Sequence, residues 1–159
     1  MKTLVAKGFA AGLCLLVLVP IASAKAPLSR LIISGGNLSQ PIEANNSQLM
    51  QASNPWFGRF ISLGNQVRIG NPPADTTRYR ITFYATFQPG QPPHPVYVVY
   101  YTFDPSTHQG FVYLPGPRDW EYRTNAASIM RRDQDGRWNV ADAGWCEQIN
   151  EIIAHSETR

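Results

Sequence analysis

Cysteine is nearly absent from this chain of 159 residues, which contains only Cys14 and Cys146. Cys14 lies in an N-terminal segment that we expect to be removed, so Cys146 is left as the single thiol of the folded part. A single thiol excludes a disulfide within one chain, and packing must therefore hold the fold together. The simplest interpretation of Cys146 is a buried thiol that acts as a small apolar side chain.

Concentrated positive charge is also absent. The chain has 14 Lys and Arg against 11 Asp and Glu, and the arginines are dispersed among the acidic residues. Domains that bind nucleic acid gather basic residues on one face, so we expect no nucleic-acid partner. A glycine-rich phosphate loop and the G-x-S-x-G motif of many hydrolases are missing as well.

The N-terminal segment, residues 1–24, has the pattern of a cleavable signal peptide. Lys2 and Lys7 give a positive start, an apolar run follows, and a small-x-small sequence ends at Ala24. The apolar run has about 14 residues, too few for a stable transmembrane helix. We therefore expect a single exported domain over residues 25–159, periplasmic or secreted, with no stable membrane insertion after cleavage.

Proline-rich joints separate stretches that have the residue pattern of β-strands. Residues 78–87 alternate between apolar and polar side chains, which is typical of a strand with one buried face. Residues 95–103 are apolar or aromatic on both faces and suit a central strand, and a turn-rich loop leads from them to a strand over 110–114. Shorter strands are expected over residues 30–34, 41–44, 60–63, 66–69 and 137–140.

Helical patterns occupy residues 46–52, residues 125–130, where Asn125 would be the N-cap, and the C-terminal segment. Asp142 is a suitable N-cap for the last helix. Its apolar residues fall on one helical face: Trp145, Ile149, Ile152 and Ile153. The sequence therefore predicts an α+β domain, with an antiparallel sheet of about five strands and a C-terminal amphipathic helix packed on it.

Part of the chain carries a resemblance to known sequences. Residues 95–101 (PVYVVYY), residues 110–116 (GFVYLPG) and Trp120 resemble a stretch of small exported bacterial proteins of unknown function. The resemblance covers under a third of residues 25–159 and consists mainly of strand and turn residues. It implies the hairpin described above, and it implies no site residue, because that group has no assigned activity.

Two sets of residues raise the alternative of a small exported hydrolase that acts on glycan or peptide material of the envelope. Cys146 lies early in the last helix, where the helix dipole favours a thiolate. A cysteine hydrolase also needs a histidine within hydrogen-bond reach of the thiol. His155 on the same helix is roughly 13 Å away along the helix axis, so it cannot be that partner. Asp119 and Glu121 would lie about 6.6 Å apart in an extended segment, a spacing that suits glycoside hydrolysis. A solvated, charge-balanced segment is the other interpretation.

Metal-binding patterns are incomplete. Residues 131–142 place three aspartates and Gly136 as in a calcium-binding loop, but the first position is Arg131, so we expect an Asp-Gly turn instead. The three histidines, His94, His108 and His155, lack the close spacing of zinc ligands. We expect neither a metal nor a cofactor.

Aromatic residues in polar or proline-rich surroundings are the strongest functional signal. Trp56 and Phe57 follow a proline, and Trp120 and Tyr122 lie in a charged segment. Exposed aromatic residues that form a patch often mark a recognition surface, whereas buried ones would belong to the core. The sequence therefore favours a non-enzymatic binding domain, which recognises an envelope component or a partner protein through these four residues.

Overall fold

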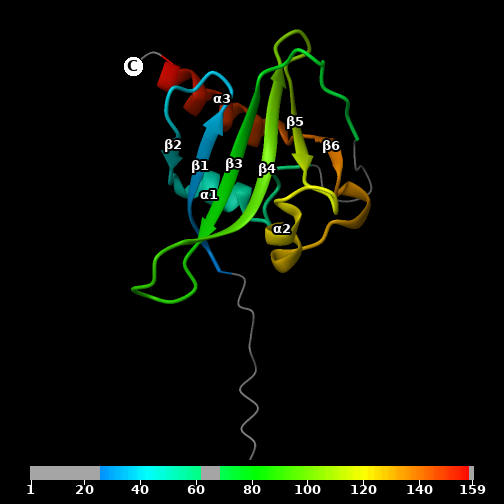
Figure 1. Cartoon of the computed structure of the whole chain (residues 1–159). Coiled ribbons are helices and arrows are strands. Elements are labelled where there is room, and N and C mark those ends of the chain that lie inside the picture. The colour runs from blue at the N-terminus through cyan, green and yellow to red at the C-terminus, as the bar shows by residue number, and fades with distance from the viewer. Residues whose placement is uncertain (1–25, 62–68, 158–159) are drawn as a thin grey trace, which may run out of the picture.

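A computed structural model of the chain describes residues 26–61 and 69–157, and the predicted signal peptide lies outside these residues. Within the described part, six antiparallel strands form one sheet in the order β2-β1-β3-β4-β5-β6 (Figure 1). The strands are β1 (Leu28–Gly35), β2 (Ile42–Ala44), β3 (Arg78–Ala85), β4 (His94–Asp104), β5 (Gln109–Leu114) and β6 (Arg137–Val140). The helices are α1 (Ser47–Ser53), α2 (Tyr122–Ser128) and α3 (Ala143–Glu157), with a short 3-10 turn over Arg132–Gln134. The predicted α+β class is confirmed, with six strands in place of about five.

Strand β3 confirms the predicted alternation and shows where it stops. Tyr79, Ile81 and Ala85 are buried on one face of the strand. The strand ends at Ala85, however, and Phe87, which the alternation placed on the buried face, is 51% exposed. The connection to β4 is rich in proline, which has no N–H to continue the ladder, and the chain therefore leaves the sheet before Phe87.

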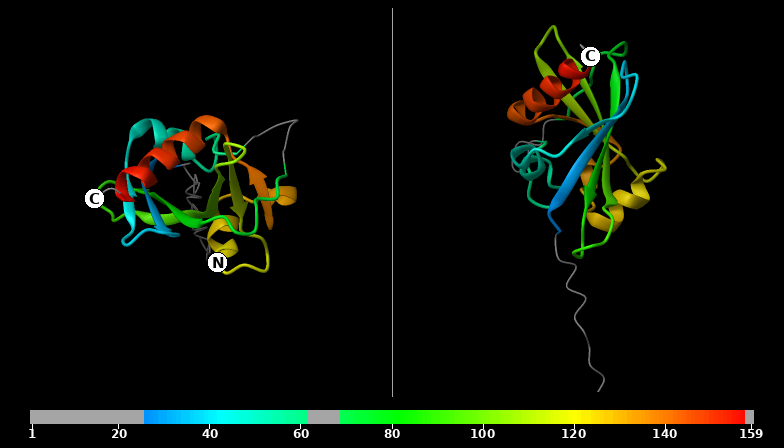
Figure 2. Two further views of the ribbon diagram at one scale, coloured as in Figure 1. Left: turned by 90° about the horizontal axis from the view of Figure 1, so that it is seen from above. Right: turned by 90° about the vertical axis from the view of Figure 1, so that its left-hand side faces the viewer.

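Helices α1 and α3 cover one face of the sheet (Figure 2, right). The backbone N–H of Trp145 donates to Asp142 Oδ1 at 3.1 Å, which confirms Asp142 as the N-cap of α3. Trp145 is buried, and its indole N–H donates to Ser53 Oγ at 2.8 Å, which joins α3 to α1. Ile149 and Ile153 are buried on the same side of α3, so the predicted amphipathic helix does pack on the sheet. No helix within the described residues is long and apolar enough to cross a membrane.

Helix α2 lies on the opposite face of the sheet (Figure 2, right). Two of its side chains form hydrogen bonds with the backbone of β4. Strand β5 ends at Leu114, so it does not pair with the first half of β4. Asn125 takes that place: its Oδ1 accepts from Val98 N at 2.7 Å and its Nδ2 donates to Val98 O at 2.8 Å. Ser128 Oγ also donates to Val96 O, so side chains of α2 satisfy backbone groups that a neighbouring strand would satisfy.

This arrangement corrects the prediction for Asn125. The helix begins at Tyr122, and Asn125 lies inside it instead of capping its start. The amide of Asn125 makes two buried hydrogen bonds to the sheet, which a capping position would not allow. Residues 62–68 of the predicted hairpin over 60–69 lie outside the described part. Its two ends each form an isolated antiparallel bridge, Ile61 with Ala141 and Ile69 with Asn139.

Candidate functional site

A row of side chains crosses the face of the sheet that carries α2. Successive register positions on β1, β3, β4, β5 and β6 are occupied by Ser34, Arg80, Tyr100, Tyr113 and Trp138. Residues paired directly across antiparallel strands point to the same face, so these five side chains share one surface. With strands about 4.8 Å apart, the row extends over about 19 Å.

The loop between β5 and α2 forms a wall beside this row. Arg118, Asp119, Trp120 and Glu121 of the loop line a hollow of about 630 Å³ together with the row. Arg78 and Gly35 complete its lining. We call this hollow the tryptophan groove, because Trp120 is 93% exposed at its edge.

Two tyrosines of the sheet hold the loop in place. Tyr100 Oη donates to Glu121 Oε1 at 2.6 Å, and Tyr113 Oη donates to Asp119 Oδ2 at 2.8 Å. The backbone N–H of Gly116 also donates to Asp119 Oδ2, at 2.7 Å. We call these two tyrosine–carboxylate pairs the tyrosine clamp. Because the clamp fixes the residues on both sides of Trp120, the indole is exposed on a well-anchored loop.

The backbone of the loop allows little change at Gly116. A Cβ atom added to Gly116 would lie 2.5 Å from the Cα of Gly136, which is closer than real Cβ contacts. Gly136 N donates to Leu114 O at 2.7 Å, so the turn before β6 packs directly against the loop. Glycine at position 116 is therefore required by the close approach of two backbone segments.

The charges of the clamp follow from its hydrogen bonds. Partial burial opposes ionisation of Glu121, but the Tyr100 hydroxyl and the nearby Arg80 guanidinium outweigh it and lower the pKa of Glu121 below its ordinary value. Arg80 Nε lies 3.5 Å from Glu121 Oε1. Burial, followed by the hydrogen bond to Asp119, raises the pKa of Tyr113 to about 12. At neutral pH Glu121 is thus ionised, and Tyr113 keeps its proton.

Residues 118–123 do not form the extended segment on which the glycoside-hydrolase spacing of Asp119 and Glu121 depended. Asp119 N donates to Gly116 O at 2.8 Å and Tyr122 N donates to Asp119 O at 3.2 Å, so the chain turns here and enters α2. Each carboxylate accepts a hydrogen bond from its own tyrosine. An ionised Glu121 that already accepts a hydrogen bond has no proton to give, so Glu121 does not supply the general acid that glycoside hydrolysis needs.

Positive charge at the rim of the groove is more exposed than negative charge. Arg78 and Arg118 are exposed, and the guanidinium of Arg78 lies 5.5 Å from the centre of the Trp138 ring. The side chain of Arg80 is 41% exposed, against 15% for its partner Glu121. A ligand in the groove would therefore meet guanidinium groups before it met carboxylates.

Of the four aromatic residues predicted from the sequence, only Trp120 lines the groove. Trp56 is half-buried against the core, and its indole N–H donates to Ser128 O at 3.1 Å. Phe57 is 56% exposed but belongs to the segment after α1, and Tyr122 is half-buried at the start of α2. Strand register alone brings four other residues onto this surface, so no local pattern in the sequence indicates them: Arg80, Tyr100, Tyr113 and Trp138.

Cys146 lies on α3 and is buried on the other face of the sheet, the one that α1 and α3 cover. Its Sγ lies 3.0 Å from Tyr101 Oη, and Asn150 Nδ2 donates to it at 3.6 Å. Burial raises the pKa of the Cys146 thiol. His108 lines the same hollow of about 490 Å³, but its ring packs edge-on against Phe103. The thiol is thus protonated at neutral pH, whereas nucleophilic cysteines have a lowered pKa.

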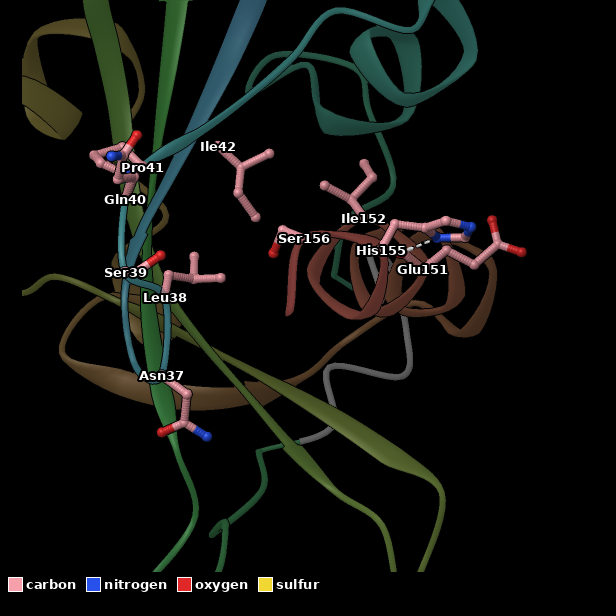
Figure 3. Close-up of a pocket in the computed structure, with 10 residues that line it drawn as sticks. All are labelled: Asn37, Leu38, Ser39, Gln40, Pro41, Ile42, Glu151, Ile152, His155 and Ser156. Carbon is pink, nitrogen blue, oxygen red and sulfur yellow. Dashed lines mark hydrogen bonds between the residues drawn. The ribbon is translucent and has the colours of Figure 1, made fainter. Parts of the chain in front are cut away.

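A larger hollow of about 890 Å³ lies between the β1–β2 connection and the end of α3 (Figure 3). Ser156 faces the β1–β2 segment, whereas the His155 ring is turned toward Glu151. Ser156 Oγ donates to Ile153 O at 2.7 Å, and His155 Nδ1 lies 2.6 Å from Glu151 O. Both of these bonds run to the backbone of α3, so the Ser156 hydroxyl donates its proton within its own helix.

Residues 131–142 form a turn and β6, as the Asp-Gly pattern predicted. Asp135 Oδ2 accepts from Arg131 N at 2.9 Å, and Gly136 has a φ of +75°. Within residues 26–61 and 69–157, no group of three or more His, Cys, Asp or Glu side chains is placed to hold a metal ion.

No protein-family model, no curated protein sequence and no solved structure matches this chain. The resemblance of residues 95–120 to small exported bacterial proteins therefore stays a prediction. The function of the chain must be inferred from the chemistry of the tryptophan groove.

Proposed function

We propose that this protein is an exported binding domain that recognises a component of the cell envelope through Trp120 and the tryptophan groove. The observation that carries the proposal is the 93% exposure of Trp120 between two residues that are hydrogen-bonded to the sheet. Export rests on the signal-peptide pattern of residues 1–24.

The free energy available from Trp120 is large for one residue. Aromatic side chains offer about 150–250 Å² of surface. Covering one face of the indole, about 100 Å², would contribute about 2.5 kcal/mol at about 25 cal/mol per Å². Because the tyrosine clamp already orders the loop, little of this would be lost to ordering the side chain and loop on binding.

The chemistry of the candidate catalytic groups also favours binding over hydrolysis. The lowered pKa of Glu121 leaves it without a proton to donate at neutral pH. The raised pKa of Cys146 keeps that thiol from acting as a nucleophile. A hydrolase built on these residues would need its general acid from a group other than Glu121, and its nucleophile from a group other than the Cys146 thiol.

The test is a thermal-shift and tryptophan-fluorescence screen of residues 25–159 against glycans, peptidoglycan fragments, lipids and divalent metals. A ligand that binds the folded state raises the unfolding temperature by mass action. We expect Trp120→Ala to weaken binding of a hit by roughly 70-fold, the equivalent of about 2.5 kcal/mol. Phe87→Ala, which removes another exposed aromatic ring that does not line the groove, is the matched control. Equal binding by both variants would refute the proposal.

A further inference from the structure

We infer that the ligand of the tryptophan groove is an acidic saccharide, a chain of sugar rings that carry carboxylate groups. This inference rests on the proposed function and adds the chemical class of the ligand. Three properties of the groove support it: the flat rings that line it, the arginines at its rim, and its open, elongated shape.

The rings form a continuous aromatic strip. The ring centres of Tyr100 and Tyr113 lie 6.3 Å apart, and those of Tyr113 and Trp138 lie 5.4 Å apart. Trp120 adds an exposed indole at the wall of the same hollow. The C–H faces of pyranose rings pack against flat aromatic surfaces, and a few placed polar groups then fix the orientation of the ligand.

The arginines of the groove favour a negatively charged ligand. Arg78, Arg80 and Arg118 line the groove, whereas its carboxylates, Asp119 and Glu121, accept hydrogen bonds from the tyrosine clamp. A guanidinium matches a carboxylate in a two-point hydrogen bond, which is shorter and stronger than a bond between neutral groups. Arg80 itself is already engaged, because its Nη1 donates to Thr82 Oγ1 at 2.8 Å and its Nε lies beside Glu121. We therefore assign the contacts with the ligand to the exposed guanidinium groups of Arg78 and Arg118.

The shape favours a chain over a compact small molecule. The row from Ser34 to Trp138 crosses five strands and extends over about 19 Å. Small-molecule sites usually bury most of their ligand in a closed cleft. An open strip of this length, with rings and guanidinium groups along it, is better suited to successive sugar units.

The experiment titrates residues 25–159 with an oligosaccharide of galacturonic acid and with its methyl ester. The two probes have the same rings, and only the first carries carboxylates. We expect the acid to bind at least tenfold more tightly than the ester. The double variant Arg78→Gln/Arg118→Gln should bring the acid down to the affinity of the ester. Arg123→Gln, which removes an exposed charge of α2 outside the groove, should leave the affinity of the acid unchanged.

One further variant keeps the outcomes distinct, and circular dichroism establishes that every variant is folded. Trp120→Ala should weaken binding of both probes. If Trp120→Ala binds the galacturonic acid oligosaccharide as tightly as the unaltered protein does, the binding is adsorption of a polyanion, and the inference is overturned. Equal binding of acid and ester, or binding of neither, would overturn it too. The proposed function would still stand if another ligand, such as a protein of the envelope, bound in a Trp120-dependent way.

Discussion

Replacement of Asn125 by alanine should destabilise the domain far more than a typical change in a short helix. Asn125 is 1% exposed, and both hydrogen bonds of its side-chain amide go to the backbone of Val98, which is also buried. Its removal leaves a backbone N–H and a backbone C=O without partners. An unsatisfied buried group costs about 1–3 kcal/mol, so we expect a loss of about 2–5 kcal/mol in the free energy of unfolding.

Urea denaturation followed by tryptophan fluorescence measures this loss. Domains of this size have an m-value of roughly 2 kcal/mol per M urea, so the midpoint should fall by about 1–2.5 M. The exposed neighbour in the same helix, Arg123, is the control, and Arg123→Ala should change stability by no more than about 0.5 kcal/mol. A loss below about 0.5 kcal/mol in Asn125→Ala would refute the view that Asn125 replaces a neighbouring strand.

The variant Asn125→Asp separates the two hydrogen bonds by pH. An ionised carboxylate still accepts from Val98 N, but it faces the Val98 carbonyl without a proton to donate. The protonated carboxyl group fits both partners, so folding should raise its pKa above the ordinary value of about 3.9. A raised pKa adds stability that is present at low pH and is lost as the pH rises through the raised value. We therefore expect this variant to recover stability relative to the unaltered chain between pH 7 and about pH 4.

Three other changes test separate parts of the structure. Cys146 should react with a disulfide reagent only as fast as the protein unfolds, because it is buried and its pKa is raised; rapid reaction of the native protein would contradict this. Gly144→Ala should raise the free energy of unfolding by about 0.5–1 kcal/mol, because glycine within a helix is less stable than alanine. The added Cβ would make only an ordinary contact, with Asp142 Oδ1 at 3.5 Å. A denaturation curve that shows lower stability would contradict this. Tyr100→Phe should lower the free energy of unfolding by about 1–2 kcal/mol at pH 7, because the hydrogen bond to Glu121 is lost. Because folding lowers the pKa of Glu121, that difference should shrink as the pH falls below the ordinary value of 4.5; a difference independent of pH would argue against the hydrogen bond.

Features that depend on local periodicity could be predicted from the sequence. The alternation in β3 and the N-cap of α3 at Asp142 each rest on neighbouring residues, and both are confirmed. An indole in a charged segment is unusual, so the sequence indicates Trp120 as an exposed residue, and it is exposed in the fold. Its role in binding stays a proposal.

Features that depend on strand register could not be predicted. Tyr100 and Tyr113 are 13 positions apart in a hairpin, and only the pairing of β4 with β5 places them side by side. The turn at Gly116 then brings Asp119 within reach of Tyr113. The sequence predicts a helix cap at Asn125, because asparagine is common at caps and no neighbouring residue indicates that β5 ends too early to cover Val98.

The central claim is that ligand binding takes place at the tryptophan groove, and an NMR titration of ¹⁵N-labelled residues 25–159 with the galacturonic acid oligosaccharide tests it most directly. The chain has four tryptophans, and each gives one indole N–H signal. We predict that the signals of Trp120 and Trp138 shift as the oligosaccharide is added. Those of Trp56 and Trp145, whose indoles donate to Ser128 and Ser53, should stay in place. Shifts confined to Trp56 or Trp145, or an unchanged Trp120 signal at saturation, would contradict the account.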